Sequence, residues 1–582
     1  MIRATLVWLV LVVLVPGGLI AAEPAIPKPE HPRPDAMRAH WANLNGRWDF
    51  RFDAEDTGLR DGWEKPDAPG FDRTIVVPFP WESELSGIHQ PKGAPKVGWY
   101  RRHFRVPGEF PADHRVWLRF GAVDWQADVW VNGQKAGAHA GGYTPFEFDI
   151  TDTLQRGGEN VLVVRAFDPT DPSLPTGKQI HWYTPSSGIW QTVWLEARPR
   201  GYIADFRMIP ALEPARVTFL VTAAGLPVGG EYQVRAEARY FEGGDRFSAV
   251  QTAKVQDPRT SFEFTLEVPN PQLWTPESPH LYDVALELRD GQEKVIDSIQ
   301  TYFGLRTIGR GKYGDAPFER ILLNGKPVFL RMALDQSFNP KGIYTAPDDE
   351  FLKRDMVITK SMGLNGLRIH IKPDEPRRLF WADRYGVLLF QDMPNTWQQN
   401  ARARAAWEQT MREAVARDRN HPAIIAWVAF NETWGLGKAE DYKKDRDTQH
   451  WVGDMVQAIR ALDSTRLVED NSPCNYDHIV NTDINSWHFY IDDHKAARKH
   501  IEQVVEQTRP GSPFNYCPGL VQSGRPLMNS EYGAVSAGGG DRDISWGLRD
   551  LTTQLRRHRA IQGFIYTELT DIEWEHNGLV NY

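Results

Sequence analysis

Two glutamates stand at the ends of short apolar stretches and could do chemistry together. Residues 424–430 are all apolar and are followed directly by Asn431 and Glu432. A second short stretch begins at Pro526 and ends on Glu531. Runs of this kind are typical of strands buried on both faces, and in a parallel barrel the polar residues at their carboxyl ends face the pocket. Two carboxyl groups that meet over one substrate are the machinery of glycoside hydrolysis.

Each glutamate taken alone has a simpler interpretation. A glutamate after an apolar strand is commonly a solvated loop residue, or it lies near the start of the next helix. The pair favours the functional interpretation, because each glutamate follows a strand and helix-forming segments lie between them.

The elements that must position this pair alternate between strand and helix from residue 318 onward. Strands are expected near 328–333, 366–370, 387–392, 424–430, 466–469, 484–488, 526–530 and 563–568. Helices are expected near 348–362, 375–384, 401–418, 447–462, 495–507 and 544–561. This alternation predicts a catalytic (β/α)8 TIM barrel over 318–582. Because the chain stops at Tyr582, soon after the eighth strand, we expect a barrel truncated before its closing helix.

The first half of the chain has the pattern of all-β domains. Residues 40–199 hold many short alternating runs without a convincing helix, and Asn132-Gly133 is a strong hairpin signal. They predict a β-sandwich of the jelly-roll kind. Residues 200–306 again contain short strands in a length typical of an immunoglobulin-like sandwich, although no cysteine is present there.

Composition limits the classes of partner. The net charge is −9 over 582 residues and no basic patch is visible, which argues against a nucleic-acid partner. The 22 tryptophans suit a protein that stacks aromatic rings on sugars, although tryptophan is also a large core residue.

The first 22 residues have the form of a signal peptide. Arg3 precedes an apolar run over 6–15, and Ala21-Ala22 offers small residues for cleavage. We therefore expect a secreted or periplasmic protein with no membrane attachment after cleavage; an uncleaved membrane anchor is the alternative.

Only two cysteines are present, Cys474 and Cys517. Export permits a disulfide between them, but two cysteines in a large domain can equally stay unpaired. Neither lies near a histidine with metal-ligand spacing.

A set of short motifs carries a resemblance to a known family. In the first half they are Trp99-Tyr100-Arg101-Arg102, Val129-Trp130-Val131-Asn132-Gly133, Gly141-Gly142-Tyr143-Thr144-Pro145-Phe146, Gly188-Ile189-Trp190 and Phe303-Gly304-Leu305-Arg306. In the second half they are Leu323-Asn324-Gly325-Lys326-Pro327, Asn431-Glu432 and Asn529-Ser530-Glu531-Tyr532-Gly533. Together and in this order they resemble glycoside hydrolase family 2, which contains β-galactosidases, β-glucuronidases and β-mannosidases.

The resemblance implies a retaining exo-β-glycosidase in which Glu432 is the acid/base and Glu531 the nucleophile. The physical requirements agree, because Glu432 must carry a proton for the leaving oxygen while Glu531 must stay ionised. A neighbouring ionised Glu531 is expected to raise the proton affinity of Glu432.

Further site residues follow from the same resemblance. Asn431 matches the residue that hydrogen-bonds the sugar 2-hydroxyl, with a helix cap as the alternative. Arg368 matches an arginine that keeps Glu531 ionised, with a structural ion pair as the alternative. The family usually has a tyrosine near the nucleophile, but the spacing of residues 486–490 departs from the family pattern. Either Tyr490 or His488 could therefore serve in its place. We favour Tyr490, with a buried core tyrosine as the alternative.

Other positions are more open. Asp335, after the first barrel strand, either contacts the sugar or pins its loop, as does Gln336. Trp574 is expected to provide a stacking face, because the eighth strand lacks the tryptophan often found at its end.

Departures from the family pattern shape the expected substrate. The Asn-x-Lys motif of the glucuronidases is replaced by Glu575-His576-Asn577, and an acid would repel a carboxylate sugar. The metal ligands of large bacterial β-galactosidases find no counterpart around 392–395, so no metal or other cofactor is expected. A neutral β-glycoside, first a β-galactoside, is the predicted substrate.

Two further readings stay open. One is a β-mannosidase or another family 2 enzyme acting on a complex glycan. The other is a carbohydrate-binding protein that kept the fold and lost turnover, against which the presence of both carboxylates counts. The oligomeric state is left open by the sequence.

Overall fold

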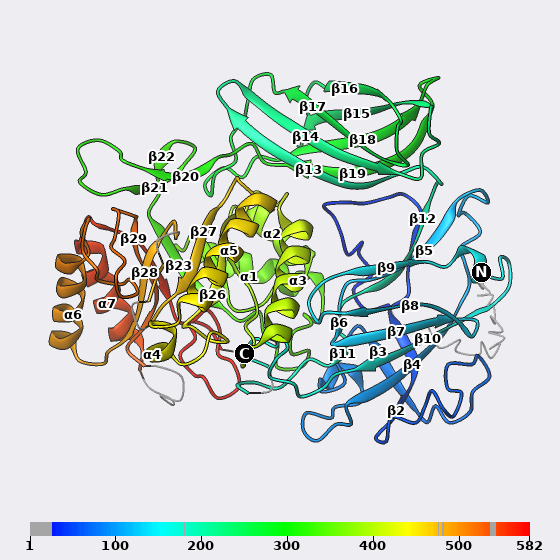
Figure 1. The fold of residues 1–582 in the computed structure, drawn as a ribbon, viewed down its shortest axis with the longest axis horizontal. Coiled ribbons are helices and arrows are strands. Elements are labelled where there is room, and N and C mark those ends of the chain that lie inside the picture. Colours follow the sequence, from blue (N-terminus) through cyan, green and yellow to red (C-terminus); the bar gives the residue numbers. More distant parts are fainter. Residues whose placement is uncertain are drawn as a thin grey trace, which may run out of the picture.

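The computed structural model describes residues 26–581, except 180, 242, 475–476, 480–481 and 536–542. The predicted signal peptide, residues 1–22, lies outside the described residues. Among the helices of the described part, none has the length and apolar character needed to cross a membrane. The described chain forms two β-sandwiches and a barrel (Figure 1).

The first sandwich consists of antiparallel sheets with alternating burial along their strands. One sheet has the order β1 (Trp41–Asn43), β12 (Val193–Arg198), β5 (Arg115–Phe120), β9 (Phe146–Asp149). The other has the order β3 (Arg73–Val77), β2 (Gly46–Phe52), β4 (Val97–Phe104), β10 (Asn160–Phe167), β7 (Gln126–Val131), β8 (Gln134–Ala140). A small pair joins β6 (Val123–Asp124) to β11 (Gly188–Ile189). In β5 the buried residues Val116, Leu118 and Phe120 alternate with less buried ones, as expected for a strand with one face in the core.

The second sandwich packs a three-stranded sheet on a four-stranded sheet. The first has the order β13 (Tyr202–Leu212), β14 (Ala215–Ala224), β17 (Arg259–Glu267). The second has the order β16 (Phe247–Lys254), β15 (Glu231–Tyr240), β18 (Tyr282–Asp290), β19 (Val295–Phe303). A small antiparallel sheet then leads into the barrel through β20 (Ile308–Gly311), β21 (Arg320–Leu323) and β22 (Lys326–Pro327).

The barrel contains eight parallel strands, and they match the stretches that the sequence predicts. They are β23 (Leu330–Asp335), β24 (Gly366–Ile369), β25 (Leu388–Asp392), β26 (Ile424–Asn431), β27 (Leu467–Ser472), β28 (Asn485–Tyr490), β29 (Leu527–Gly533) and β30 (Ile561–Tyr566). Hydrogen bonding runs in the order β27-β26-β25-β24-β23-β30-β29-β28. The fold prediction of two sandwiches and a TIM barrel is confirmed.

The two ends of this sheet meet where the catalytic residues are expected. The backbone N–H of His488 in β28 donates to the carbonyl of Pro473, just after β27, at 3.1 Å. Ser472 Oγ lies 2.8 Å from His488 Nε2. The barrel therefore closes through these contacts beside the pocket.

Helices surround the strands and lie close to their predicted positions (Figure 1). They are α1 (Asp349–Ser361), α2 (Pro376–Tyr385), α3 (Ala401–Asp418), α4 (Ala439–Tyr442), α5 (Arg446–Leu462), α6 (His494–Gln507) and α7 (Ser545–Arg557). Side-chain caps begin several of them; Asn400, for example, accepts a hydrogen bond from the Ala403 N–H at the start of α3. The short helix α4 was not predicted, because four residues give no periodic signal.

A long loop makes one of the contacts between the first sandwich and the barrel. Residues 168–187 connect β10 with β11 and reach across to the segments that follow β24 and β25. The N–H of Gly177 donates to the carbonyl of Asn395 at 3.1 Å, and Trp397 Nε1 donates to the carbonyl of Gly177 at 2.9 Å. This loop brings part of the first domain to the mouth of the barrel.

Candidate active site

The backbone turns sharply where β26 delivers the first glutamate. All eight residues of β26 are buried, and the strand ends at Asn431. Glu432 and Thr433 then adopt positive φ angles of 51° and 61°. Such conformations are uncommon for residues other than glycine and concentrate at functional sites. The turn sets the Glu432 side chain at the carboxyl end of the barrel.

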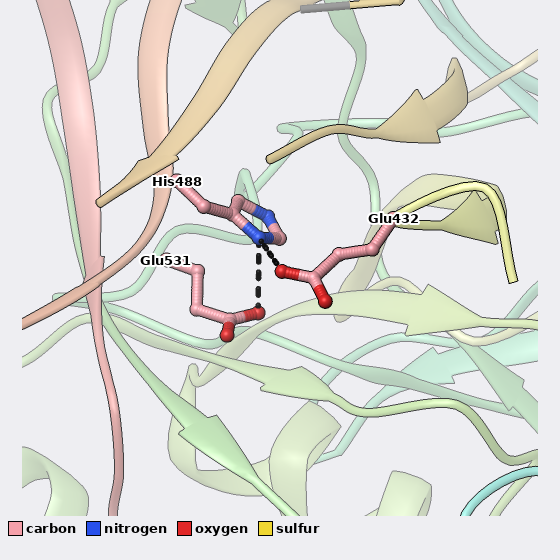
Figure 2. A group of neighbouring side chains, drawn as sticks. All are labelled: Glu432, His488 and Glu531. Atoms are coloured by element: carbon pink, nitrogen blue, oxygen red, sulfur yellow. Dashed lines mark hydrogen bonds and ion pairs between the residues drawn. The ribbon is translucent and has the colours of Figure 1, made fainter. Parts of the chain in front are cut away.

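The second glutamate lies in β29 at an irregularity of the sheet. The register between β28 and β29 shifts between Trp487 and His488, opposite Asn529 and Glu531. A bulge of this kind re-aims side chains next to active sites. Here it places Glu531 beside His488 and within reach of Glu432 (Figure 2).

His488 links the two carboxylates. Its Nδ1 lies 2.8 Å from Glu432 Oε1 and 3.5 Å from Glu531 Oε2 (Figure 2). One ligand atom from each of the three side chains lies within 4.8 Å of the others. On the other side of the ring, Ser472 Oγ lies 2.8 Å from His488 Nε2 and donates to Ser530 Oγ at 2.8 Å. These contacts fix the orientation of the imidazole.

Tyr490 contacts the nucleophile candidate directly. Its hydroxyl donates a hydrogen bond to Glu531 Oε1 and lies 3.1 Å from Thr567 Oγ1. Burial, and then the Glu531 charge, raises the pKa of Tyr490, so the hydroxyl keeps its proton and can donate. Of the two candidates from the sequence, Tyr490 binds Glu531 and His488 binds Glu432; both belong to the site.

Arg368 connects four of the barrel strands. Its guanidinium lies 2.8 Å from Asp392, donates to Asn431 Oδ1 at 2.8 Å and to the carbonyl of Ser530 at 3.2 Å, and sits 3.6 Å from Glu531 Oε2. The bond to Asn431 Oδ1 orients that amide with its NH2 group as the remaining donor. Arg368 therefore forms a structural ion pair with Asp392 and also places a positive charge beside Glu531.

The charge state of Glu432 differs from the sequence expectation. Burial opposes its ionisation, but the hydrogen bond and charge of His488, together with the charges of Lys178 and Arg368, lower its pKa below the ordinary value. The sequence reasoning counted only Glu531 as a neighbour and expected the opposite direction. The cations that surround Glu432 explain the difference.

Asp335 is occupied by its own loop. At the end of β23, its carboxylate accepts the Ser337 N–H at 2.7 Å and pairs with the buried guanidinium of Arg378. This arrangement supports the second alternative from the sequence, that Asp335 pins the loop. The neighbouring Gln336 is buried, and its side chain interacts with Glu568.

Trp574 belongs to an aromatic rim over the barrel mouth. Its ring centroid lies 5.4 Å from that of Trp182, and its Nε1 donates to the Trp182 carbonyl at 3.0 Å. Trp182 also lies 5.4 Å from Trp434, which lies 5.0 Å from Trp397. Trp574 keeps 40% of its surface exposed, so it has a free face beside the pocket.

The sequence did not indicate that three further residues belong to the candidate site. Lys178 comes from the loop of the first sandwich, and Glu568 and Glu575 follow β30. Burial, and then the neighbouring Glu575, raises the pKa of Glu568 well above the ordinary value. Lys178 Nζ lies 4.0 Å from Glu575 Oε1, so the acid that was expected to repel a carboxylate sugar has a cation beside it. No local motif marks Lys178, because its partners lie in a different domain.

The two cysteines do not form a disulfide. Cys517 is buried and its Sγ donates to the carbonyl of Asp477 at 3.3 Å. Burial, followed by the charge of Glu432, raises the pKa of Cys474, which therefore stays a thiol.

Comparison with known families agrees with this geometry. The sugar-binding domain of glycosyl hydrolases family 2 matches residues 41–199, a second family 2 domain matches 201–306, and the family 2 TIM-barrel domain matches 318–568. These segments cover most of the chain in the order in which the three folded units occur.

Individual relatives carry different activities in their names. A β-galactosidase of Thermoanaerobacter pseudethanolicus is 30% identical over 385 residues, which is 64% of this chain. The chain spans only 50% of the length of that relative. The β-glucuronidase of Felis catus is 26% identical over 569 residues, 88% of this chain and 80% of the relative.

Among solved structures, a Ruminococcus gnavus β-glucuronidase in complex with D-glucuronic acid superimposes with a TM-score of 0.75 at 21% identity. The superposition covers 94% of this chain and 96% of that one, which shows a shared fold. With the three family models matched in sequence along it, the chain belongs to glycoside hydrolase family 2.

Proposed function

We propose that the protein is a retaining β-glycosidase that removes terminal sugars through a covalent glycosyl-enzyme. The observation that carries this proposal is the closeness of its two carboxylates, because oxygens of Glu432 and Glu531 lie within 4.8 Å of each other. Retaining enzymes hold their carboxyl groups about 5–5.5 Å apart, whereas inverting enzymes leave roughly 6.5–9.5 Å for a water molecule.

In the first step, Glu531 attacks the anomeric carbon as that carbon loses its glycosidic oxygen. Its Oε1 accepts the Tyr490 hydroxyl, while Oε2 has no hydrogen-bond partner among the described residues and is the oxygen that attacks. The electron pair of the broken bond goes to the leaving oxygen, which takes the proton of Glu432. Asn431 Nδ2, oriented by Arg368, donates to the sugar 2-hydroxyl.

In the second step, Glu432 acts as the base. Its carboxylate takes a proton from water, the water oxygen bonds to the anomeric carbon, and Glu531 leaves as a carboxylate. The lowered pKa of Glu432 in the sugar-free site suits this base role. For the first step Glu432 needs its proton, and a bound sugar favours the protonated form by excluding water from the carboxyl group.

The aromatic rim supports action at the end of a glycan. Trp182, Trp434 and Trp574 stand with the loop 168–187 over one side of the barrel mouth. A chain running through the site in both directions would meet this rim, whereas a terminal sugar fits beneath it.

Two substrate classes have specific support. The lack of lysine at 575–577 favours a neutral sugar such as a β-galactoside, and one relative is named a β-galactosidase. A β-uronide is favoured by Lys178 beside Glu575, which removes the repulsion expected from that acid, and by the relatives named β-glucuronidases. We take the uronide as the stronger candidate, because its argument rests on the charges of the folded site.

The direct test is a panel of para-nitrophenyl β-glycosides with the stereochemistry followed by proton NMR. The panel contains glucuronide, galacturonide, galactoside, glucoside and mannoside. The sugar released first should be the β-anomer. An α-anomer as the first product would overturn the retaining mechanism, and no turnover of any member would overturn the enzyme proposal.

Glu531→Ala should reduce kcat by roughly 10⁴-fold or more, because the covalent step loses its nucleophile. Added azide should restore part of the turnover and give an α-glycosyl azide, since the small anion can occupy the vacated space. Near wild-type activity on an activated aryl glycoside would show that Glu531 is not the nucleophile.

A further inference from the structure

We propose that Lys178, delivered by the loop 168–187 of the first sandwich, is the specificity residue that binds the carboxylate of a terminal uronic acid. This inference rests on the proposed glycosidase function and names its anionic substrate class. It assigns recognition of the charge to a domain other than the barrel.

The loop holds Lys178 from both sides. Gly177 is fixed to the barrel by its bonds to Asn395 and Trp397, and a Cβ at Gly177 would come within 2.6 Å of the Ile371 carbonyl. On the other side, Gln179 Nε2 donates to Tyr143 Oη at 2.8 Å and to Asp124 Oδ2 at 3.1 Å. With its two neighbours held in this way, the lysine has little freedom to swing out of the site.

Within the described part of the chain, the buried ammonium group has only a long ionic contact, 4.0 Å to Glu575 Oε1. The Lys178 side chain is only 8% exposed, yet its Nζ lies 3.5 Å from Tyr183 Oη and 4.0 Å from Glu575 Oε1. Lys28 shows the usual arrangement for a buried lysine, with Nζ 2.9 Å from Glu375. Burying a charge is costly unless it is closely paired, so the spare donors of Lys178 point to an anion that arrives from outside.

The ammonium group lies near the aromatic rim and close enough to Glu432 to act on its charge. Lys178 Nζ lies 5.4 Å from the ring centroid of Trp182 and 6.0 Å from that of Trp434, both in the aromatic rim. Its charge also acts on Glu432 and on His370, lowering the pKa of each. The ammonium therefore lies beside the rim and within electrostatic reach of the acid/base candidate, and we infer that a charged substituent of the sugar binds here.

The neighbouring acids leave this cation able to accept an anion. Burial and Glu575 keep Glu568 protonated, since its pKa is raised well above the ordinary value. Glu575 has another donor, because Trp182 Nε1 binds its Oε1 at 2.7 Å. A substrate carboxylate can then pair with Lys178 while Glu575 keeps the indole hydrogen bond.

A bound carboxylate would also assist catalysis. By neutralising Lys178 it would remove one of the charges that disfavour protonated Glu432, so the acid would gain its proton when the correct substrate is in place. Charge recognition and acid activation would thus be coupled at one residue.

The test compares matched substrate pairs in Lys178→Met, Lys178→Arg and the wild type. The pairs are para-nitrophenyl glucuronide with glucoside and galacturonide with galactoside, which differ only in the carboxylate at the sixth carbon. For Lys178→Met, the uronide-to-hexoside ratio of kcat/KM should fall roughly 10- to 100-fold, as expected for the loss of a charged hydrogen bond. Lys178→Arg should recover part of the ratio.

Lys135→Met is the matched control. Lys135 lies in the same sandwich, is 54% exposed and pairs with Asp128 at 2.9 Å, so its removal should leave the ratio unchanged. An equal loss on both members of each pair would mean that Lys178 is structural, and an unchanged ratio would overturn the proposal. If Lys178→Met does not fold, product inhibition of the wild type tests the proposal instead. Glucuronate should then inhibit at a lower concentration than glucose, and equal inhibition by the two sugars would overturn the proposal.

This result is separable from that of the proposed function. If the wild type hydrolyses hexosides but no uronide, the glycosidase proposal stands and the role of Lys178 falls. If it hydrolyses neither, the proposed function itself is wrong.

Discussion

At the scale of single residues, the candidate site gives its two carboxylates different hydrogen-bond partners. Glu432 bonds His488, while Glu531 bonds Tyr490. The residue types and their positions at strand ends were enough to find both glutamates. The partner of each could not be read from sequence, because the choice between His488 and Tyr490 depends on a bulge between β28 and β29.

Glu432→Gln tests the acid role through the leaving group. Without the acid, a poor leaving group such as an alkoxide should lose activity by roughly 10²- to 10⁴-fold. A dinitrophenolate needs no proton and should still depart, so its glycoside should show a burst as the covalent intermediate accumulates. Equal losses for good and poor leaving groups would show that Glu432 is not the acid.

His488→Phe tests the control of the Glu432 proton. Burial raises the pKa of Glu432, but interactions that favour the carboxylate outweigh burial and lower the pKa. The largest of these interactions is the hydrogen bond to His488. Removing the imidazole should raise that pKa. In the proposed mechanism the protonated form of Glu432 is the acid, and this form is lost as pH rises through its pKa. The alkaline limb of kcat/KM should therefore move to higher pH in His488→Phe.

The matched variant is His488→Asn, whose amide can reach the place of Nδ1 and should restore part of the original pH profile. An alkaline limb that stays in place in both variants would mean that His488 does not control the charge of Glu432.

At the scale of elements, the strands could be predicted and their cross-links could not. The eight barrel strands have strong apolar runs because parallel strands are buried on both faces. Asp335, by contrast, ends β23 at a place where a sugar contact is one of the two expected roles, yet it pairs with Arg378 on α2. That ion pair joins elements whose spacing in the sequence carries no signal.

Arg368→Met tests the cross-link among β24, β25, β26 and β29. The substitution leaves Asp392 buried and without its cation, which should lower the free energy of unfolding by about 3–5 kcal/mol. Denaturant unfolding measures this loss. Arg412→Met, which removes a half-exposed pair with Glu408 on α3, is the control and should change the free energy by less than about 0.5 kcal/mol.

A loss in Arg368→Met as small as that of the control would show that Asp392 finds another partner or becomes protonated. Burial raises the pKa of Asp392, so the second response would appear as a milder loss of stability at low pH. The sign follows because protonated Asp392 no longer needs a cation.

At the scale of the whole molecule, the barrel shares a buried apolar cluster with each of the two sandwiches. A buried cluster that includes Tyr143 and Trp190 of the first sandwich also contains Phe338, Tyr344 and Ile572 of the barrel. The sequence indicated three units with short links between them. It could not show that Lys178 of the first unit lies 4.0 Å from Glu575 of the third, because contacts between domains leave no periodic pattern.

Arg306, at the junction of the second sandwich and the barrel, tests how tightly these units are coupled. It is fully buried and donates to the carbonyls of Pro422, Thr465 and Ile424 at 2.9, 3.1 and 2.6 Å. Arg306→Met would remove the Arg306 hydrogen bonds to three barrel carbonyls, at a cost of about 3 kcal/mol. Among the described residues, only the carbonyl of Ile424 keeps a second side-chain donor, Arg466 Nε at 3.1 Å. Since the loss falls on the contact between units, calorimetry should show the wild-type transition broaden or split, with the barrel unfolding at the lower temperature.

The control is Arg239→Met, which removes a half-exposed ion pair with Asp283 in the same sandwich and should leave the transition unchanged. A single sharp transition in Arg306→Met at the wild-type temperature would mean that Arg306 does not couple the two units.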